Sequence, residues 1–323
     1  MSKTICIYHK KDLDGKASGA IVKLKYPEVQ LIGWDYGDPI PVIEPGNDII
    51  VVDICLETKL TTNEDKFEPM NHLAEISNSM IWIDHHKSSI EKYEKSDSPF
   101  KNDIICVLQI GKAGCELAWD YFFGQEPMPK MIELLGEYDT WRNEDHIRWE
   151  KVTMPFQFGM RVQHTSVDDV LNLLKSECRI CRWCGSDQTL WAGEQYRCKS
   201  CGQGFNTFNV SKTIDGIVHD GKTVLQYQSR QNTNAMRFQS YELEFDGYKA
   251  IVCNNPMFNS QLFYGFYDEA KHDIMICWIF DGKLFKYSLY STKDDVDVSK
   301  IAVAHGGGGH KGAAGFENEK YIL

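Results

Sequence analysis

Residues 80–86 read Met-Ile-Trp-Ile-Asp-His-His. The first four side chains are all apolar, without the alternation of a half-exposed strand, so we expect a strand that is covered on both faces, as in a parallel sheet. Asp84, His85 and His86 follow at its carboxyl end, where two adjacent histidines have no packing purpose. The segment therefore predicts an α/β fold with a polar site at one edge of its sheet.

The same pattern recurs outward from this segment across the first 140 residues. Short apolar runs rich in Ile and Val predict further strands at 3–8, 29–34, 48–53 and 103–108. Segments with helical spacing lie between or after them, at 15–26, 61–77, 114–123 and 128–138. Strands that alternate with helices predict a doubly wound α/β domain around a parallel sheet.

Acids and imidazoles gather where these strands end. The first predicted strand runs into His-Lys-Lys-Asp-Leu-Asp-Gly (9–15), the third ends at Asp53, and the fourth ends at Asp84. Ligands of such sheets bind beyond the carboxyl ends of the strands. Alone, the first motif also fits a solvated loop in which Asp14 caps the following helix. With the aspartate of Gly-Glu-Tyr-Asp-Thr-Trp (136–141), the candidate metal ligands are His9, Asp12, Asp14, Asp53, His85 and Asp139.

This ligand set predicts two divalent cations. Four carboxylates that converge in one crevice repel each other unless cations lie among them. Oxygen ligands mixed with imidazole, without thiolates, favour manganese or magnesium, and iron, cobalt and zinc remain compatible. Because paired metals are a common arrangement for displacement at phosphorus, we expect phosphoryl chemistry with manganese as the first choice.

Composition and charge limit the classes of function. The 323 residues carry 35 Lys and Arg against 46 Asp and Glu, which gives a net charge of −11. Such a chain is not expected to bind extended duplex nucleic acid, whereas a metal site still accepts a small anionic substrate. No apolar run approaches the ~18 residues of a membrane span, and no signal-peptide pattern opens the sequence. We expect a cytoplasmic protein without a membrane segment.

Four of the eleven cysteines predict a structural zinc site. They lie in two Cys-x-x-Cys-Gly segments, 181–185 and 198–202, with thirteen residues between Cys184 and Cys198. Two tight turns joined by a short hairpin are typical of a zinc ribbon, with free thiols or a redox pair as alternatives. Neighbouring basic and aromatic side chains fit either stacking on nucleic-acid bases or packing at a domain junction. The expected ligands are Cys181, Cys184, Cys198 and Cys201.

From residue 214 onward the pattern predicts a second, α+β domain. Asp-Gly turns within apolar runs predict hairpins at 217–228, 241–253 and 274–290, and helices are expected at 260–270 and 298–304. The chain then reads Gly-Gly-Gly-Gly-His at 306–310. Successive glycine N–H groups can surround an anion, so this run is a candidate phosphate-binding segment, with a flexible linker as the alternative. Its candidate residues are Gly307, Gly308, Gly309 and His310.

Taken in order, these motifs resemble the DHH phosphoesterase superfamily. The resemblance rests on HxxDxDG at 9–15, Asp53, the Asp-His-His of 84–86, Asp139 and the terminal GGGGHKGAAGF of 306–316. Within the superfamily, the sequence most resembles the branch that has a DHH-associated C-terminal domain. This branch includes nano-RNases and RecJ-type exonucleases. It implies a catalytic domain at 1–177, a zinc-ribbon insertion at 178–206, and a substrate-binding domain at 213–323.

The resemblance also implies a role for each site residue. Asp84 and His86 would be catalytic, because Asp84 fixes an imidazole tautomer and His86 faces the substrate phosphate. The spacing departs from the family in one place, since two residues rather than three separate His9 from Asp12. One metal would be held by His9, Asp12 and Asp53, and the other by Asp14, Asp53, His85 and Asp139.

The implied function is a two-metal phosphodiesterase that hydrolyses short single-stranded oligonucleotides through a hydroxide bridging the metals. Enzymatic alternatives are hydrolysis of a cyclic di- or oligonucleotide, or of 3′-phosphoadenosine-5′-phosphate, and a pyrophosphatase fits less well. The alternative of another class is a non-catalytic nucleic-acid-binding module that works through the zinc ribbon. A homodimer is compatible with the sequence.

Overall fold

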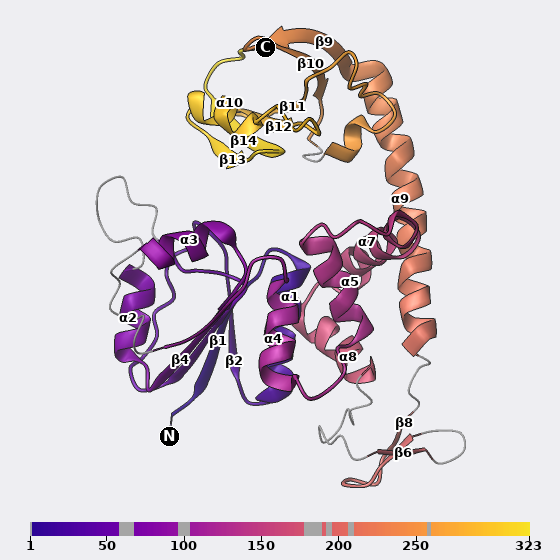
Figure 1. Ribbon diagram of the computed structural model, residues 1–323. Helices are drawn as coiled ribbons and strands as arrows, with labels where there is room; N and C mark the ends of the chain where they lie inside the picture. Colours follow the sequence, from indigo (N-terminus) through magenta and orange to yellow (C-terminus); the bar gives the residue numbers. More distant parts are fainter. Residues whose placement is uncertain are drawn as a thin grey trace. The chain divides into compact units, whose positions relative to one another are not determined.

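The computed structural model describes residues 2–57, 68–95, 104–177, 189–191, 196–205, 210–256 and 260–323. By its internal contacts the chain divides into two units, Met1–Val224 and Leu225–Leu323 (Figure 1). Within the described ranges, no helix is both long enough and apolar enough to cross a bilayer.

The first unit is built on a parallel sheet, which among the described residues has five strands in the order β2-β1-β3-β4-β5. Strand β1 lies between β2 and β3. The connection from β1 to β2 therefore runs toward one edge of the sheet, and the strands from β3 onward are added toward the other edge. In open α/β sheets the ligand crevice lies at such a switch point. The predicted doubly wound fold is confirmed. The strands are β1 (Thr4–His9), β2 (Gln30–Trp34), β3 (Asp48–Val52), β4 (Ser79–Asp84) and β5 (Ile105–Leu108).

Helices cover both faces of this sheet (Figure 1). One face packs on α1 (Leu13–Lys25) and α4 (Gly114–Phe123), against which α5 (Lys130–Asp139) and α8 (Val167–Glu177) pack in turn. The other face packs on α2 (Glu68–Ile76) and α3 (Lys87–Lys95). Neighbouring residues of one strand therefore enter different cores: Cys6 joins the first and Ile7 the second. This explains the apolar runs without alternation.

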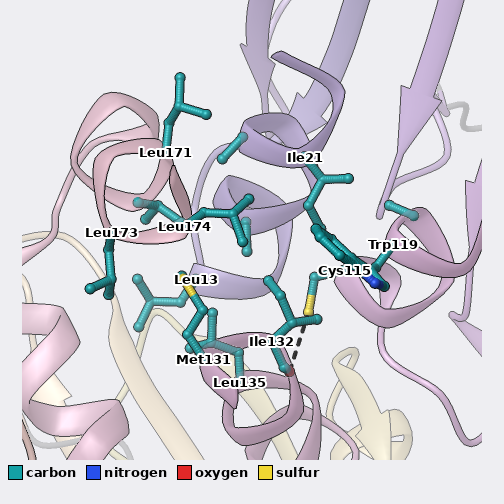
Figure 2. Packing of buried hydrophobic residues seen from close by; sticks show 14 of the residues in the cluster. Leu13, Ile21, Cys115, Trp119, Met131, Ile132, Leu135, Leu171, Leu173 and Leu174 are labelled. Carbon is teal, nitrogen blue, oxygen red and sulfur yellow. Dashed lines mark hydrogen bonds between the residues drawn. The ribbon is translucent and has the colours of Figure 1, made fainter. Parts of the chain in front are cut away.

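The core on the α1 side joins side chains of several helices and of the sheet in one packed cluster (Figure 2). Ile21 of α1 and Leu174 of α8 are fully buried, and Trp119 of α4 lies in the same cluster. The Cys115 thiol is buried near the Ile132 carbonyl, which explains an isolated cysteine in an apolar segment. This packing fixes the amino ends of α1 and α4, which both contribute to the site described below.

Helix α1 begins at Leu13, two residues before the expected start. Its N-cap is Asp12, whose Oδ1 accepts a hydrogen bond from the Gly15 N–H at 2.9 Å, so Asp14 is not the cap. A Cβ at Gly15 would lie 2.0 Å from the His9 carbonyl oxygen. Only glycine allows the helix to start this close to the end of β1.

The predicted hairpin at 217–228 is wrong, because these residues belong to helix α9 (Val210–Gln239). Ile214, Ile217, Val218 and Gly221 are buried at the spacing of one helical face. Gly221 lies against α7 (Met154–Gln163), and a Cβ there would come within 1.7 Å of the Pro155 carbonyl oxygen. The glycine therefore serves a close helix–helix contact rather than a turn. The other elements here are α6 (His146–Arg148), the π-helix η2 (Trp149–Thr153) and α7 (Met154–Gln163).

Three short antiparallel strands lie between α8 and α9, namely β6 (Thr189–Trp191), β7 (Tyr196–Cys198) and β8 (Gly204–Phe205). Strand β6 falls between the two Cys-x-x-Cys segments, and β7 ends at Cys198, the first residue of the second segment. Cys181 and Cys184 lie outside the described residues, as does the greater part of the proposed ribbon.

The second unit contains a mixed sheet with the order β13-β14-β12-β11-β10-β9 among the described residues. Only β10 and β11 pair in parallel within it. Besides the carboxyl-terminal half of α9, its helices among the described residues are the 3-10 helix η3 (Ser260–Phe263) and α10 (Val298–Ala304). Its strands are β9 (Ser240–Phe245), β10 (Tyr248–Asn254), β11 (Ile274–Phe280), β12 (Phe285–Tyr290), β13 (Gly308–His310) and β14 (Ala313–Asn318).

Two of the predicted hairpins in this unit are confirmed. Asp246 and Gly247 both have positive φ, at 50° and 83°, as a two-residue turn between β9 and β10 requires. Asp281 and Gly282 lie in the turn between β11 and β12. The predicted helix 260–270 is wrong beyond Phe263, because Gly265 has φ +80° and ends the helical path.

Candidate metal centre

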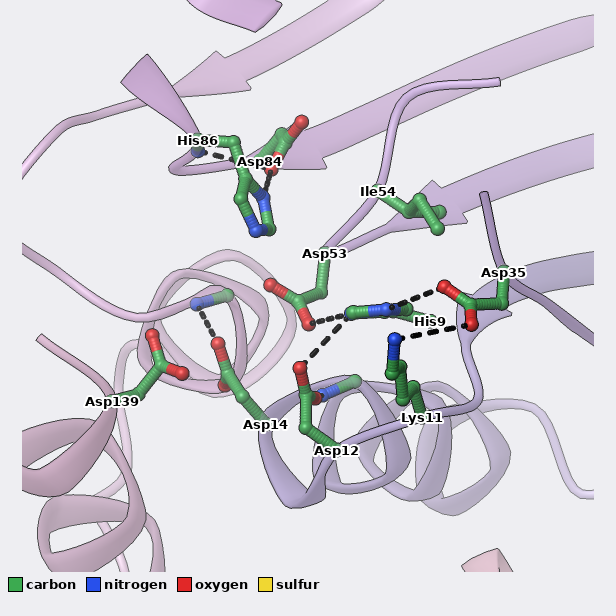
Figure 3. A network of polar contacts seen from close by, with 12 residues as sticks. His9, Lys11, Asp12, Asp14, Asp35, Asp53, Ile54, Asp84, His86 and Asp139 are labelled. Atoms are coloured by element: carbon green, nitrogen blue, oxygen red, sulfur yellow. Dashed lines mark hydrogen bonds and ion pairs between the residues drawn. The ribbon is translucent and has the colours of Figure 1, made fainter. Parts of the chain in front are cut away.

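The predicted ligands of unit 1 meet at the carboxyl edge of its sheet (Figure 3). His9 ends β1, Asp53 follows β3, and Asp84 ends β4 directly before His85. Asp139 comes from elsewhere, as the last residue of α5. Side chains from distant parts of the sequence thus face one crevice beside the β1–β3 switch point.

Asp53 lies at the centre of this group. It is fully buried, and its Oδ2 is 3.6 Å from His9 Nδ1 while its Oδ1 is 3.2 Å from His85 Nε2. Neither oxygen has a partner in hydrogen-bonding geometry among the described residues. Its φ of 59° is left-handed, a conformation that aspartate tolerates better than most residues and that carries a cost in free energy. A buried carboxylate that accepts no aligned hydrogen bond from the described residues, held in a strained backbone, is the state expected of an anion placed for a cation.

His9 forms one group with Asp12 and Asp53. Its Nδ1 lies 3.0 Å from Asp12 Oδ2 and has no hydrogen-bond partner by geometry within the described part. Its Nε2 lies 3.3 Å from Asp35 Oδ1 (Figure 3). Since a carboxylate only accepts, Asp35 places the ring proton on Nε2 and leaves the Nδ1 lone pair for a metal.

Asp35 was missed in the sequence analysis. It follows Trp34, the last residue of β2, and so lies at the carboxyl end of a predicted strand. That position was the available signal, because Asp53 and Asp84 also lie at the carboxyl ends of strands.

Asp14, His85 and Asp139 form the other group. His85 Nε2 lies 3.5 Å from Asp14 Oδ2 and 3.4 Å from Asp139 Oδ2. The Asp14 carboxylate also accepts hydrogen bonds from the N–H groups of Gly114 and Cys115, at 2.8 and 2.7 Å. These are the first N–H groups of α4, whose positive helix end favours an anion. A Cβ at Gly114 would lie 2.6 Å from Asp53 Oδ1, so glycine is needed where α4 meets the centre.

A partly buried ion pair holds Asp139 near the start of α4. Glu116 Oε1 accepts from Arg142 Nη2 at 2.7 Å, and its Oε2 accepts from the Ala113 N–H at 2.9 Å. Arg142 follows Asp139 by three residues, and its N–H donates to the Glu137 carbonyl at the end of α5. Glu116 therefore links the end of α5 to the start of α4. The end of α5 carries Asp139 and the start of α4 holds Asp14, so this link keeps both carboxylates beside His85.

Asp84 is fully buried and orients the histidine pair rather than joining the two groups. Its Oδ1 accepts from the N–H groups of His85 and His86, at 2.8 and 3.2 Å, and from His86 Nδ1 at 2.8 Å. The His86 Nδ1 therefore carries a proton, and Nε2 is the atom left for a ligand. The His86 side chain is 34% exposed, against 13% for His85.

Crowding of like charges shifts the titration of the centre. Burial and the neighbouring Asp53 raise the pKa of Asp14 to about 8. Burial and Asp14 raise the pKa of Asp139 to about 7. Burial opposes the charged form of His9, but Asp12 and Asp53 outweigh it and raise the pKa of this imidazole to about 10. The polypeptide alone thus keeps protons among the acids, which is the situation that bound cations would relieve.

The residues present fit divalent metals. Three sets of ligand atoms lie within 4.8 Å of one another, namely His9–Asp12–Asp53, Asp14–His85–Asp139 and Asp53–His85–His86. The donors are imidazole nitrogens and carboxylate oxygens, as manganese or magnesium prefers. Asp53 has one oxygen toward each histidine, His9 and His85, so it lies between the first two sets.

The glycine run of the second unit has packing reasons at several positions. Gly306 has φ +81°, and the next N–H donates to the Ala302 carbonyl, as in a glycine C-cap of α10. A Cβ at Gly307 would lie 2.1 Å from the Gly315 carbonyl oxygen, whereas Gly308 faces open space. The run forms the ordered strand β13 with exposed residues Gly308, Gly309 and His310, and is not a linker.

The chain is similar to several known proteins. It is 27% identical over 259 residues to the uncharacterized protein R106 of Acanthamoeba polyphaga mimivirus, a match that covers 78% of this chain and 50% of that relative. The chain thus spans half the length of the curated relative it matches. No protein-family model matches it.

Solved structures similar to the chain include the pGpG-specific phosphodiesterase PggH of Vibrio cholerae, with 10% identity and a TM-score of 0.46 over 98% of this chain and 93% of that one. Another is RecJ of Thermus thermophilus in complex with Mg²⁺, with 14% identity and a TM-score of 0.39 over 98% of this chain and 47% of that one.

Proposed function

We propose that the protein is a metal-dependent phosphodiesterase of the DHH superfamily that hydrolyses short single-stranded oligonucleotides. The order of the motifs supports the superfamily, and the geometry of the centre supports the chemistry. The observation that carries the proposal is Asp53, whose two buried oxygens lie between two sets of ligands without a hydrogen-bond donor among the described residues.

Two divalent cations, manganese in this proposal, fit the two sets. One would be held by His9, Asp12 and Asp53, and the other by Asp14, Asp53, His85 and Asp139. When bound, such cations lower the pKa of water and offset negative charge at phosphorus. Asp35 keeps the His9 lone pair on Nδ1, and the α4 N–H groups hold the Asp14 carboxylate in place.

His86 acts on the substrate from the exposed side of the centre. Burial opposes its charged form, but Asp84 outweighs this and raises the pKa of the His86 imidazole. The protonated ring donates from Nδ1 to Asp84, so its Nε2–H is free to donate to a phosphate oxygen. A donor directed at the oxygen where charge develops stabilises the transition state more than the ground state.

The remaining parts of the proposal concern the other segments of the chain. Gly307, Gly308, Gly309 and His310 would contact a substrate phosphate in a substrate-binding domain at 213–323. Cys181, Cys184, Cys198 and Cys201 would hold one structural zinc in a ribbon at 178–206, after a catalytic domain at 1–177. Zinc content measured by mass spectrometry on wild type and Cys181→Ser tests the ribbon, with a fall from about one zinc per chain expected.

The experiment that tests the activity is a substrate panel with manganese. End-labelled RNA and DNA of two to five nucleotides, a longer single strand, a cyclic dinucleotide and 3′-phosphoadenosine-5′-phosphate are incubated with the full chain, and products are resolved by mass. We expect metal-dependent cleavage of the short linear substrates. Asp53→Asn should abolish it, whereas Asp48→Asn, at the amino end of the same strand, should not.

The outcomes separate the alternatives. Cleavage of the cyclic or 3′-phosphorylated nucleotide alone would replace the substrate class while keeping the chemistry. Binding of oligonucleotides without turnover at any metal concentration would favour a non-catalytic module. Near-normal turnover by Asp53→Asn would overturn the assignment of the centre.

A further inference from the structure

The loop after β2 places a tyrosine beside the metal centre. The Asp38 N–H donates to the Asp35 carbonyl at 3.0 Å, and Gly37 has φ +99°, so residues 35–38 form a type II turn with Tyr36 at its second position. Two further contacts hold the turn: Asp38 Oδ2 accepts from the Asp35 N–H at 2.9 Å and lies 2.6 Å from Lys10 Nζ. The position of Tyr36 is therefore fixed by its own loop.

The ring of Tyr36 lies next to a candidate metal ligand. Its centroid is 6.3 Å from that of the His9 ring, with an interplanar angle of 67°, and 5.5 Å from that of Trp34. The same loop carries Asp35, which holds His9 Nε2 (Figure 3). Tyr36 thus borders the side of the centre formed by the ends of β1 and β2.

The two ends of the Tyr36 side chain are in different environments. Its hydroxyl is hydrogen-bonded to Ser89 and to the backbone of Cys55, and burial together with the nearby Asp84 raises the pKa of the phenol. The residue as a whole is nevertheless 43% exposed. The hydroxyl is anchored by segments that follow β3 and β4, while much of the residue remains exposed to solvent.

An anchored and exposed ring at this place suits a planar ligand. A ring that is already held by its hydroxyl loses little conformational entropy when a ligand stacks on it. Nucleobases stack on aromatic side chains whatever their identity, because each base has a π-face. A base adjacent to a phosphate held at the centre would be within reach of this ring, since His9 lies between the two.

We propose that Tyr36 is a stacking residue for the nucleobase next to the scissile phosphate. This inference rests on the proposed phosphodiesterase function and makes its substrate class narrower. The base must be unpaired and unstacked on one side to pack on Tyr36, so single-stranded ends are accepted and paired bases are not. Tyr36 is a specificity-determining residue, separate from the metal ligands.

The test compares two ligands that differ only in the base. One is a fluorescent dinucleotide with a methylene group in place of the scissile oxygen, and the other is the same compound with the base beside the phosphonate replaced by hydrogen. Dissociation constants are measured with manganese for wild type, Tyr36→Leu, Tyr36→Trp and Tyr36→Phe. Tyr121→Leu, which removes a similarly exposed tyrosine of α4, is the matched control.

Tyr36→Leu should weaken binding of the base-bearing ligand about tenfold or more and leave the abasic ligand within about twofold. Tyr36→Trp keeps a stacking surface and should stay within about threefold of wild type. Tyr36→Phe keeps the ring but removes the hydroxyl that anchors it. Its loss of affinity for the base-bearing ligand should therefore lie between those of Tyr36→Trp and Tyr36→Leu. Tyr121→Leu should bind both ligands as wild type does.

A loss in Tyr36→Leu that is equal for both ligands would indicate a structural role and overturn the inference, as would equal binding of both ligands by wild type. Should Tyr36→Leu fail to fold, the same two ligands on wild type and Tyr36→Trp still decide the matter. Selective binding through Tyr36 without turnover of any substrate would end the proposed function and would leave only the stacking contact of the inference. Metal-dependent turnover, together with equal dissociation constants for the base-bearing and the abasic ligand, would support the proposed function and overturn this inference.

Discussion

Metal-free protein should lose stability as the pH rises from 6 to 8. The pKa of Asp14 is about 8 in the folded protein, against an ordinary value of 3.8. Between these values the folded state holds a proton that the unfolded chain has released, so the free energy of unfolding falls as the pH rises. Over this interval the loss from Asp14 alone is about 2 kcal/mol.

The histidines of the centre change stability in the same direction. Carboxylates outweigh the effect of burial and raise the pKa of His9 and of His85 to about 10. Stability that depends on their protonated forms is complete below their ordinary pKa and is lost as the pH rises through about 10. For a unit of this size, a loss of about 2 kcal/mol from Asp14 corresponds to a fall in Tm of about 4–8 °C.

Thermal unfolding at pH 6, 7 and 8, with EDTA and with excess manganese, measures this effect. Protons compete with the metal for the same ligands, so the increase in Tm on adding manganese should be larger at pH 8 than at pH 6. Asp14→Asn cannot titrate and should flatten the profile in EDTA. A Tm in EDTA that is constant, or that rises from pH 6 to pH 8, would refute the crowded centre as described.

Two further predictions test glycines. Gly114→Ala places a Cβ 2.6 Å from Asp53 Oδ1. Manganese affinity measured by calorimetry should therefore fall about 10–100-fold, while the Tm in EDTA changes little. Unchanged affinity would contradict the close approach of α4 to the centre. Gly221→Val should lower the free energy of unfolding in urea by about 1–3 kcal/mol, because its Cβ would meet the Pro155 carbonyl oxygen at 1.7 Å. Gly216→Ala, in the same helix with nothing within 4 Å, should be neutral or stabilising, and equal effects of the two would count against helix α9 at this place.

The parallel sheet could be predicted because continuous apolar runs directly reflect burial on both faces. The meeting of His9, Asp53 and His85 at one edge was also predictable, since all three lie at or just after the carboxyl ends of strands. Their distances and orientations required the structure. The roles assigned to these residues remain proposals.

Other features depend on contacts that a linear pattern does not carry. Asp220-Gly221 indicates a turn by its residue types, but buried Ile214, Ile217 and Val218 place it within a helix. The direction of the Tyr36 ring is set by partners after β3 and in α3, far from it in the sequence. Such pairings become visible only when the strands are side by side.

The left-handed backbone at Asp53 has a consequence for which substitutions are informative there. Alanine would remove the carboxylate and also force a Cβ-bearing residue without a polar side chain into an unfavourable φ. Asparagine accepts this backbone and gives up only the charge, and glycine accepts it and gives up the whole side chain. Aspartate alone satisfies the conformation and supplies two anionic oxygens, so two independent features of the structure favour it at this position.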